Sequence, residues 1–161
     1  MQLPVYFISD IHLMLKNTER ENEKLARISS FFKHIQKTGG TLFIVGDLFD
    51  FYFEYPHVIP KVYFIFYSEV FALKQKGIEI HYILGNHDYW VSDFIQDTIT
   101  NKTYFDDVQF ELGGKKFYVT HGDGLLSRDK GYRIVKVILR NRFFIWCFRW
   151  LHPTFGYLFG N

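Results

Sequence analysis

The sequence contains four short, nearly continuous apolar runs, and polar residues that can bind a metal ion follow each run at once. The runs are rich in β-branched and aromatic residues, as expected of strands buried on both faces, and they cover residues 5–8, 42–45, 80–84 and 117–119. Ligands of an open α/β sheet bind beyond the carboxyl ends of its strands. We therefore predict that the four polar clusters meet in one crevice.

The segments between the runs predict an α/β fold with a parallel sheet. Apolar residues at helical spacing indicate helices over residues 19–36 and 60–77. Alternation of strand and helix is typical of parallel strands joined by right-handed crossovers. A further short helical segment is expected over residues 92–99. Gly113-Gly114 between two strand-like runs indicates a hairpin, so we also expect a second, partly antiparallel sheet.

Composition and charge divide the chain into two sections. We predict a core over residues 1–126 and a basic, aromatic helical section over residues 127–161; from Leu125 onward, seven basic residues stand against Asp129 alone. The lone Cys147 excludes an internal disulfide and favours a reducing compartment. The sequence shows neither a signal peptide nor a run long enough to span a bilayer, so we expect a cytoplasmic protein or one bound to a membrane face.

The polar clusters combine carboxylate, imidazole and amide groups. Their members are Asp10 and His12 after the first run, Asp47 and Asp50 after the second, Asn86, His87 and Asp88 after the third, and His121 and Asp123 after the fourth. Such mixed donors favour Mn²⁺, Fe²⁺ or Zn²⁺ over Ca²⁺, which prefers oxygen ligands alone. Two ions about 3.5–4 Å apart could share one carboxylate, and Asp47 is the natural bridge.

These ligands point to the hydrolysis of phosphate esters or anhydrides. Water held by such ions has its pKa lowered toward about 7, which supplies a hydroxide nucleophile at neutral pH, while the ions neutralise phosphoryl oxygens. We expect His87 to protonate the leaving oxygen and Asp88 to fix the tautomer of His87. Asp50 would either orient a ligand or satisfy loop amides. The remaining histidines are expected to be solvated or structural: His34, His57, His81 and His152.

The motifs Asp-x-His, Gly-Asp-x-x-Asp, Gly-Asn-His-Asp and His-Gly-Asp are similar to the motif set of the calcineurin-like metallophosphoesterases. This resemblance implies a four-layer αββα sandwich of two mixed sheets. It assigns one ion to Asp10 and His12, the bridging position to Asp47, and the other ion to Asn86 and His121. It makes His87 the acid or a phosphate contact, and we place Asp50 and Asp123 behind the ligands.

Within that superfamily, Gly-Asp-Leu-Phe-Asp-Phe, Gly-Asn-His-Asp-Tyr-Trp and His-Gly-Asp-Gly resemble the UDP-2,3-diacylglucosamine pyrophosphatases of lipid A synthesis, which release UMP and 2,3-diacylglucosamine 1-phosphate. Better-known members carry arginine in place of His87. The family pattern also ends with Gly-His-x-His, which these 161 residues lack. We therefore expect a truncated core in which each ion lacks a ligand, with weakened metal affinity and little turnover.

The basic aromatic section has two interpretations. It is either an amphipathic helix pair packed on the core, or a lid that holds acyl chains and rests on anionic lipid. Nucleic acid ranks lower as a partner, because the arginines alternate with bulky aliphatic residues. The lid interpretation, together with the resemblance, implies a peripheral protein of a Gram-negative inner membrane. It places substrate contacts at Arg128, Tyr132, Arg133, Arg140, Phe143 and Trp146.

Three functions therefore stay open. The first is a metal-dependent hydrolase of a lipid-linked nucleotide diphosphate, which the polar clusters and the cationic section favour. The second is a phosphodiesterase with a different substrate. The third is a catalytically silent binding or scaffold module that keeps the fold, which only the missing histidines favour.

Overall fold

A parallel sheet forms the centre of the fold, as the sequence predicts. The computed structural model describes residues 1–123 and 130–158, with the backbone alone at 130 and 132–135. In this part of the chain four parallel strands pair in sequence order: β1 (Val5–Ile8), β2 (Thr41–Val45), β3 (Glu79–Ile83) and β4 (Lys102–Tyr104). Every residue of β2 is buried, which explains why its sequence is a continuous apolar run.

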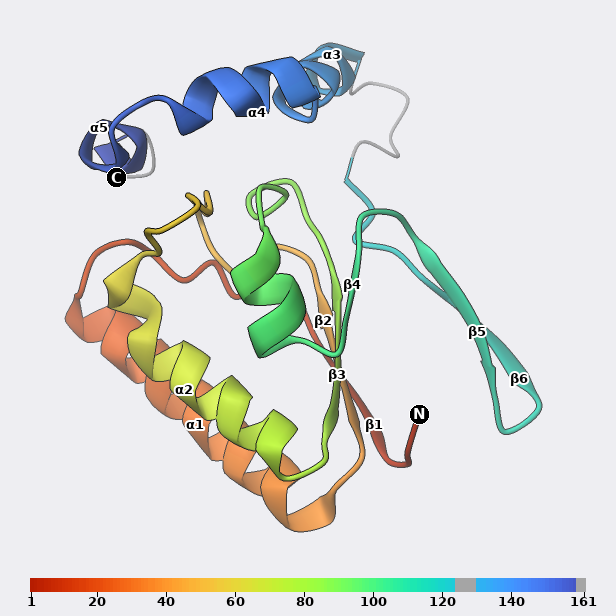
Figure 1. The fold of residues 1–161 in the computed structure, drawn as a ribbon. Helices are drawn as coiled ribbons and strands as arrows, with labels where there is room; N and C mark the ends of the chain where they lie inside the picture. Colours follow the sequence, from red (N-terminus) through yellow and green to blue (C-terminus); the bar gives the residue numbers. More distant parts are fainter. Residues whose placement is uncertain (124–129, 159–161) are drawn as a thin grey trace.

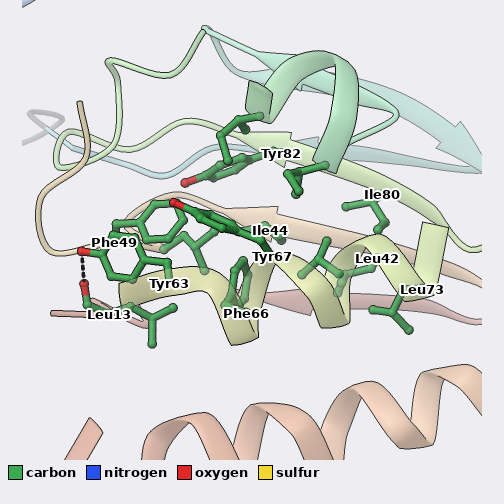
Figure 2. Packing of buried hydrophobic residues seen from close by; sticks show 14 of the residues in the cluster. Leu13, Leu42, Ile44, Phe49, Tyr63, Phe66, Tyr67, Leu73, Ile80 and Tyr82 are labelled. Carbon is green, nitrogen blue, oxygen red and sulfur yellow. Dashed lines mark hydrogen bonds between the residues drawn. The ribbon is translucent and has the colours of Figure 1, made fainter. Parts of the chain in front are cut away.

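Two helices cover one face of the sheet (Figure 1). They are α1 (Glu19–Thr38) and α2 (Phe64–Gln75), the second preceded by a short 3₁₀ turn, η1 (Lys61–Tyr63). Figure 2 shows Leu42, Ile44 and Ile80 of the sheet packed against Phe66 and Leu73 of α2. This main core fixes the strands whose carboxyl ends carry the polar clusters.

A hairpin lies against the other face of the sheet. Its strands β5 (Val108–Leu112) and β6 (Lys115–Val119) pair antiparallel, and Gly113 and Gly114 supply the positive φ angles of the turn, 59° and 73°. Val108 packs with Phe43 and Ile83 in a second apolar cluster. The resemblance implied two mixed sheets in four layers. The described residues instead form one all-parallel sheet and a separate two-stranded hairpin, so neither sheet is mixed.

A short π-helical segment, η2 (Phe94–Ile99), leads from the loop after β3 into β4. The buried carboxylate of Glu54 accepts the backbone N–H groups of Ser92 at 2.9 Å and Phe94 at 2.6 Å. Burial raises the pKa of Glu54, and these amide hydrogen bonds oppose that rise. Glu54 thereby ties the segment that follows β2 to the segment that follows β3.

The described part of the basic aromatic section, residues 130–158, is mainly helical, and Figure 1 shows it as a layer across the carboxyl edge of the sheet. It comprises α3 (Lys130–Leu139), α4 (Arg142–Arg149) and α5 (Pro153–Leu158). The ring of Phe148 packs 4.6 Å from that of Phe53 and 5.3 Å from that of Trp90, measured between centroids. The Trp90 indole N–H donates to the Leu139 carbonyl at 2.8 Å. These contacts anchor α3 and α4 to the loops that carry the polar clusters.

Candidate metal centre

Backbone hydrogen bonds join the polar loops beyond the ends of β1, β2 and β3. The amide of His12 donates to the Asp47 carbonyl at 2.9 Å, and the amide of Gly46 donates to the Ile83 carbonyl at 2.7 Å. Below them, the buried Tyr63 hydroxyl donates to the Leu13 carbonyl at 3.0 Å (Figure 2). The three loops are therefore held in register before any ligand is considered.

Three candidate ligands have a left-handed backbone. Asp10, His12 and Asp47 have φ angles of 52°, 48° and 49°, and they are the non-glycine residues with positive φ in the described part of the chain. Such a conformation is uncommon outside glycine, although Asp and His tolerate it better than most residues. Unfavoured backbone geometry that the surrounding structure imposes is typical of functional sites.

Two glycines let the loops approach one another closely. A Cβ atom at Gly46 would collide with the His121 ring, and a Cβ at Gly85 would collide with both the carboxylate and the backbone nitrogen of Asp47. Gly46 also has a φ of 72°. The glycines of the Gly-Asp and Gly-Asn motifs thus make room for ligands supplied by a different loop.

The buried carboxylate of Asp47 lies at the centre of the site. Its Oδ1 accepts the His87 backbone N–H at 3.1 Å, and its Oδ2 lies 3.3 Å from Nε2 of His121 and 3.6 Å from Nε2 of His12. Two donor groups share Asp47, one with His12 and His87 and the other with Asp10 and His121. In each group the ligand atoms lie within 4.8 Å of one another.

Oxygen atoms lie behind the two imidazoles that face Asp47, and one of them makes a hydrogen bond. Nδ1 of His121 lies 3.3 Å from the Val45 carbonyl oxygen, which can only accept, so Nδ1 carries the hydrogen and Nε2 faces Asp47. Nδ1 of His12 lies 3.3 Å from Oδ1 of Asp50. This contact is an ion-pair distance and not a hydrogen bond, because Nδ1 of His12 has no hydrogen-bond partner among the described residues. The carbonyl behind His121 is the kind of support that is usual for a metal-binding imidazole, whereas the role of Asp50 stays a prediction.

Electrostatics keep Asp47 and His121 charged when no cation is bound. Burial acts to raise the pKa of Asp47, but hydrogen bonds from His121 and the His87 amide bring the pKa below its ordinary value. The hydrogen bond to Asp47 raises the pKa of His121 to about 9, against the opposing effect of burial. The proton on Nε2 of His121 therefore occupies the position at which a cation could bind.

The geometry groups the predicted ligands differently from the resemblance. Asp10 falls with His121 and Asp47, whereas the resemblance places it with His12. The amide oxygen of Asn86 lies 3.3 Å from Nε2 of His121, so Asn86 adjoins the second group as expected. His87, which was expected to be the acid and not a ligand, completes the first group with His12 and Asp47.

The surroundings of His87 differ from the expectation. Its Nδ1 hydrogen-bonds to the backbone carbonyl of Asp50, so this carbonyl, and not Asp88, fixes the tautomer. Asp88 is fully buried and accepts hydrogen bonds from the Tyr82 hydroxyl and from the amides of Leu48 at 2.7 Å and Gly85 at 2.8 Å. Burial raises the pKa of Asp88, and those donors oppose the rise. Asp88 therefore joins two ligand loops to the core.

The residues expected behind the ligands and in the lid lie in several places. The Asp123 carboxylate contacts Lys136 and Arg140 of α3, and the Arg140 guanidinium lies 4.1 Å from the centre of the Tyr89 ring. Phe143 and Trp146 on α4 are exposed. Arg128 lies outside the described residues, as do the side chains of Tyr132 and Arg133.

Sequence reasoning missed Lys136 and Tyr89 as neighbours of the site. Together with Arg140 they line a cavity of about 420 Å³ that also borders Asn86 and His87. Lys136 and Arg140 are four residues apart, which places both on one face of a helix. This spacing could have indicated that Lys136 belongs with Arg140. Tyr89 offered none, because only its contact with α3 distinguishes it from other loop aromatics.

The donors around Asp47 fit divalent cations. Carboxylate, imidazole and amide atoms converge there, as intermediate metal ions prefer, and a carboxylate shared by two donor groups suits a pair of ions. A family model described as calcineurin-like phosphoesterase matches residues 3–157, so the chain belongs to the calcineurin-like phosphoesterases, an enzyme class. The resemblance stated from the motifs is confirmed.

Three similar curated proteins are each named UDP-2,3-diacylglucosamine hydrolase. The Porphyromonas gingivalis protein is 29% identical over 163 residues, which cover 99% of this chain and 62% of that protein. The Aeromonas hydrophila protein is 28% identical over 146 residues, with coverages of 88% and 57%. The Neisseria meningitidis serogroup B protein is 31% identical over 143 residues, with coverages of 86% and 57%. This chain thus spans roughly three fifths of the length of these relatives.

Proposed function

We propose that this chain carries the metal centre of a hydrolase that cleaves the pyrophosphate of UDP-2,3-diacylglucosamine, giving UMP and 2,3-diacylglucosamine 1-phosphate. The observation that carries the proposal is the pair of donor groups that share Asp47 at the edge of the sheet. The names of the similar proteins support the choice of substrate. The cavity beside the donor groups supports it too, because it combines basic side chains with apolar ones such as Phe51, Leu139 and Phe148.

In this proposal two divalent ions, with Mn²⁺ preferred over Fe²⁺ or Zn²⁺, would be held by Asp10, His12, Asp47, Asn86 and His121. When bound, such ions acidify water and neutralise phosphoryl oxygens. Asp47 belongs to both donor groups, and the Val45 carbonyl orients His121. Asp50, whose carboxylate lies 3.3 Å from Nδ1 of His12, would help to orient that ring. His87 donates Nδ1–H to the Asp50 carbonyl, which leaves Nε2 free to face the substrate. In the doubly protonated imidazolium form, Nε2–H would pass its proton to the leaving oxygen and leave the neutral ring.

The test is a hydrolysis assay of the purified protein with Mn²⁺ on two substrates, UDP-2,3-diacylglucosamine and a generic phosphodiester. Hydrolysis of the nucleotide lipid at a higher kcat/KM than the generic ester supports the proposed substrate. Hydrolysis of the generic ester alone would identify a phosphodiesterase with another substrate. Binding of metal ions without hydrolysis of either substrate would identify a binding module.

Metal affinity is expected to rise with pH up to about 9, because a cation must displace the proton of His121. At pH 7.5, calorimetry in two buffers of different ionisation enthalpy should show release of about one proton per ion bound at this group. Without metal, the stability of the fold depends on pH in the opposite direction. The stabilisation by protonated His121 is fully present below pH 6.5, the ordinary pKa of histidine, and is lost as the pH rises through the raised pKa of about 9. Equal apparent heats of metal binding in the two buffers would contradict the expected proton release.

We also propose that α4 rests on an anionic membrane surface. Phe143, Trp146 and Trp150 are 63%, 56% and 76% exposed and form a continuous row of neighbouring rings. Arg142 and Arg149 stand at the two ends of the helix. Exposed aromatic side chains between arginines are typical of helices that lie in a lipid interface. In the described part of the chain, no helix is both long enough and apolar enough to cross a membrane.

Co-sedimentation with phosphatidylglycerol vesicles tests the membrane contact. The double variant W146S/W150S is expected to lower the partition coefficient by at least about tenfold, since each buried aromatic side chain contributes about 1.5–3 kcal/mol. The matched control F64S/I65S removes two exposed apolar side chains from the start of α2 and should bind as the parent does. Equal losses in both variants would show that α4 has no special role.

A further inference from the structure

A cavity of about 420 Å³ lies between the candidate metal centre and α3. Asp50, Asn86 and His87 border it on the side of the metal centre. Lys136 and Arg140 border it on the side of α3, one helical turn apart. A chemical group bound in this cavity would therefore lie next to the candidate metal centre on one side. On the other side it would contact two cationic side chains.

Among the side chains that the structure describes, Asp123 is the acidic partner of both cations. Nζ of Lys136 lies 2.6 Å from Oδ2 of Asp123, and the same oxygen lies 3.6 Å from a guanidinium nitrogen of Arg140. The Arg140 guanidinium lies over the Tyr89 ring, 4.1 Å from its centroid, and this cation–π contact holds it beside the cavity. Among the described side chains, one carboxylate facing two cations leaves an excess positive charge on this wall, where a second anion would be favoured. The carboxylate of Asp50 lies on the opposite side of the cavity.

We propose that Lys136 and Arg140 form a binding subsite for a phosphate oxyanion, and that Asp123 acts as an internal counterion that the phosphate displaces. The inference rests on the proposed function, because it adds a second phosphate contact to the substrate held at the metal centre. A planar guanidinium and a point-like ammonium together suit the several oxygens of one phosphate group. Asp123 keeps the cations in place while no phosphate is bound.

Calorimetric titration of inorganic pyrophosphate in EDTA and low salt tests the subsite without metal ions or turnover. The variant K136M/R140M is expected to weaken pyrophosphate binding by at least about tenfold, since hydrogen bonds to charged groups are the strong ones. The matched control K33M/K37M removes two exposed lysines that lie one turn apart on α1 and should leave this affinity unchanged. The variant K136R/R140K keeps both charges and should retain most of the affinity.

Asp123→Asn distinguishes a phosphate site from a purely structural ion pair. If Asp123 competes with phosphate, D123N should tighten pyrophosphate binding by about threefold or more, because the competing charge is gone. A structural pair would give the same affinity or a lower one, and that result would overturn the proposal. So would equal affinities for K136M/R140M and the parent. Absence of hydrolysis together with intact, Lys136-dependent pyrophosphate binding would reject the proposed function but keep the subsite.

Discussion

Asp47→Asn is expected to abolish tight binding of both metal ions and to lower phosphoester hydrolysis by more than about 100-fold, the upper range for loss of a residue that merely supports a ligand. The effect should be large because Asp47 is the carboxylate that the two donor groups share. Asparagine keeps the size of the side chain and tolerates the left-handed backbone at this position, where φ is 49°. The variant therefore removes the charge with little change in shape.

Metal content by elemental analysis, kcat/KM with Mn²⁺ and the unfolding midpoint check this prediction together. Asp106→Asn is the matched control, because it removes an exposed carboxylate from the loop between β4 and β5 and should leave all three quantities unchanged. Two ions retained per chain in D47N, with activity near that of the parent, would show that Asp47 does not bridge a metal pair.

Gly85→Ala is the second large effect we expect. The added Cβ would collide with the carboxylate and the backbone nitrogen of Asp47, and a change of rotamer does not move a backbone atom. The loop after β3 must therefore shift away from the loop after β2. We expect a destabilisation of about 1–3 kcal/mol, as for other overpacked sites, together with a loss of metal affinity.

Urea unfolding and metal titration measure the two effects of Gly85→Ala. Gly131→Ala is the control, since nothing lies within 4 Å of the added methyl group and the position is inside α3. Alanine is also the better helix former there, so the control should be neutral or slightly stabilising. Unchanged stability and metal affinity in G85A would mean that the two loops are not packed as described.

The parallel sheet and the meeting of the polar clusters could be predicted because both follow from local patterns. A buried central strand such as β2 must be apolar throughout, and parallel strands direct their carboxyl ends to one edge. Strand β4 escaped prediction, since Lys102, Thr103 and Tyr104 form too short and too polar a run. The run at residues 117–119 lies in the predicted hairpin, but it is half-buried or exposed and not buried on both faces as expected. His121 after it still reaches Asp47.

The finer arrangement of the site depends on contacts that no motif encodes. Adjacency in Gly-Asn-His-Asp suggested that Asp88 serves His87, but consecutive residues in a loop point in different directions, and Asp88 points into the core. The same holds for Asp123, which was placed behind the ligands and contacts α3. Such directions depend on tertiary packing, which spacing along the chain does not report.

The buried Asp88 has a consequence for how the metal centre behaves when it is empty. Tyr82, which lies within the main core, and the amides of Leu48 and Gly85 all converge on this one carboxylate. Hydrogen bonds inside the protein thus set the distance between the two ligand loops, and this distance does not depend on the cations. Chelation should therefore leave a scaffold ready to be reloaded, so that one divalent ion can be exchanged for another without refolding.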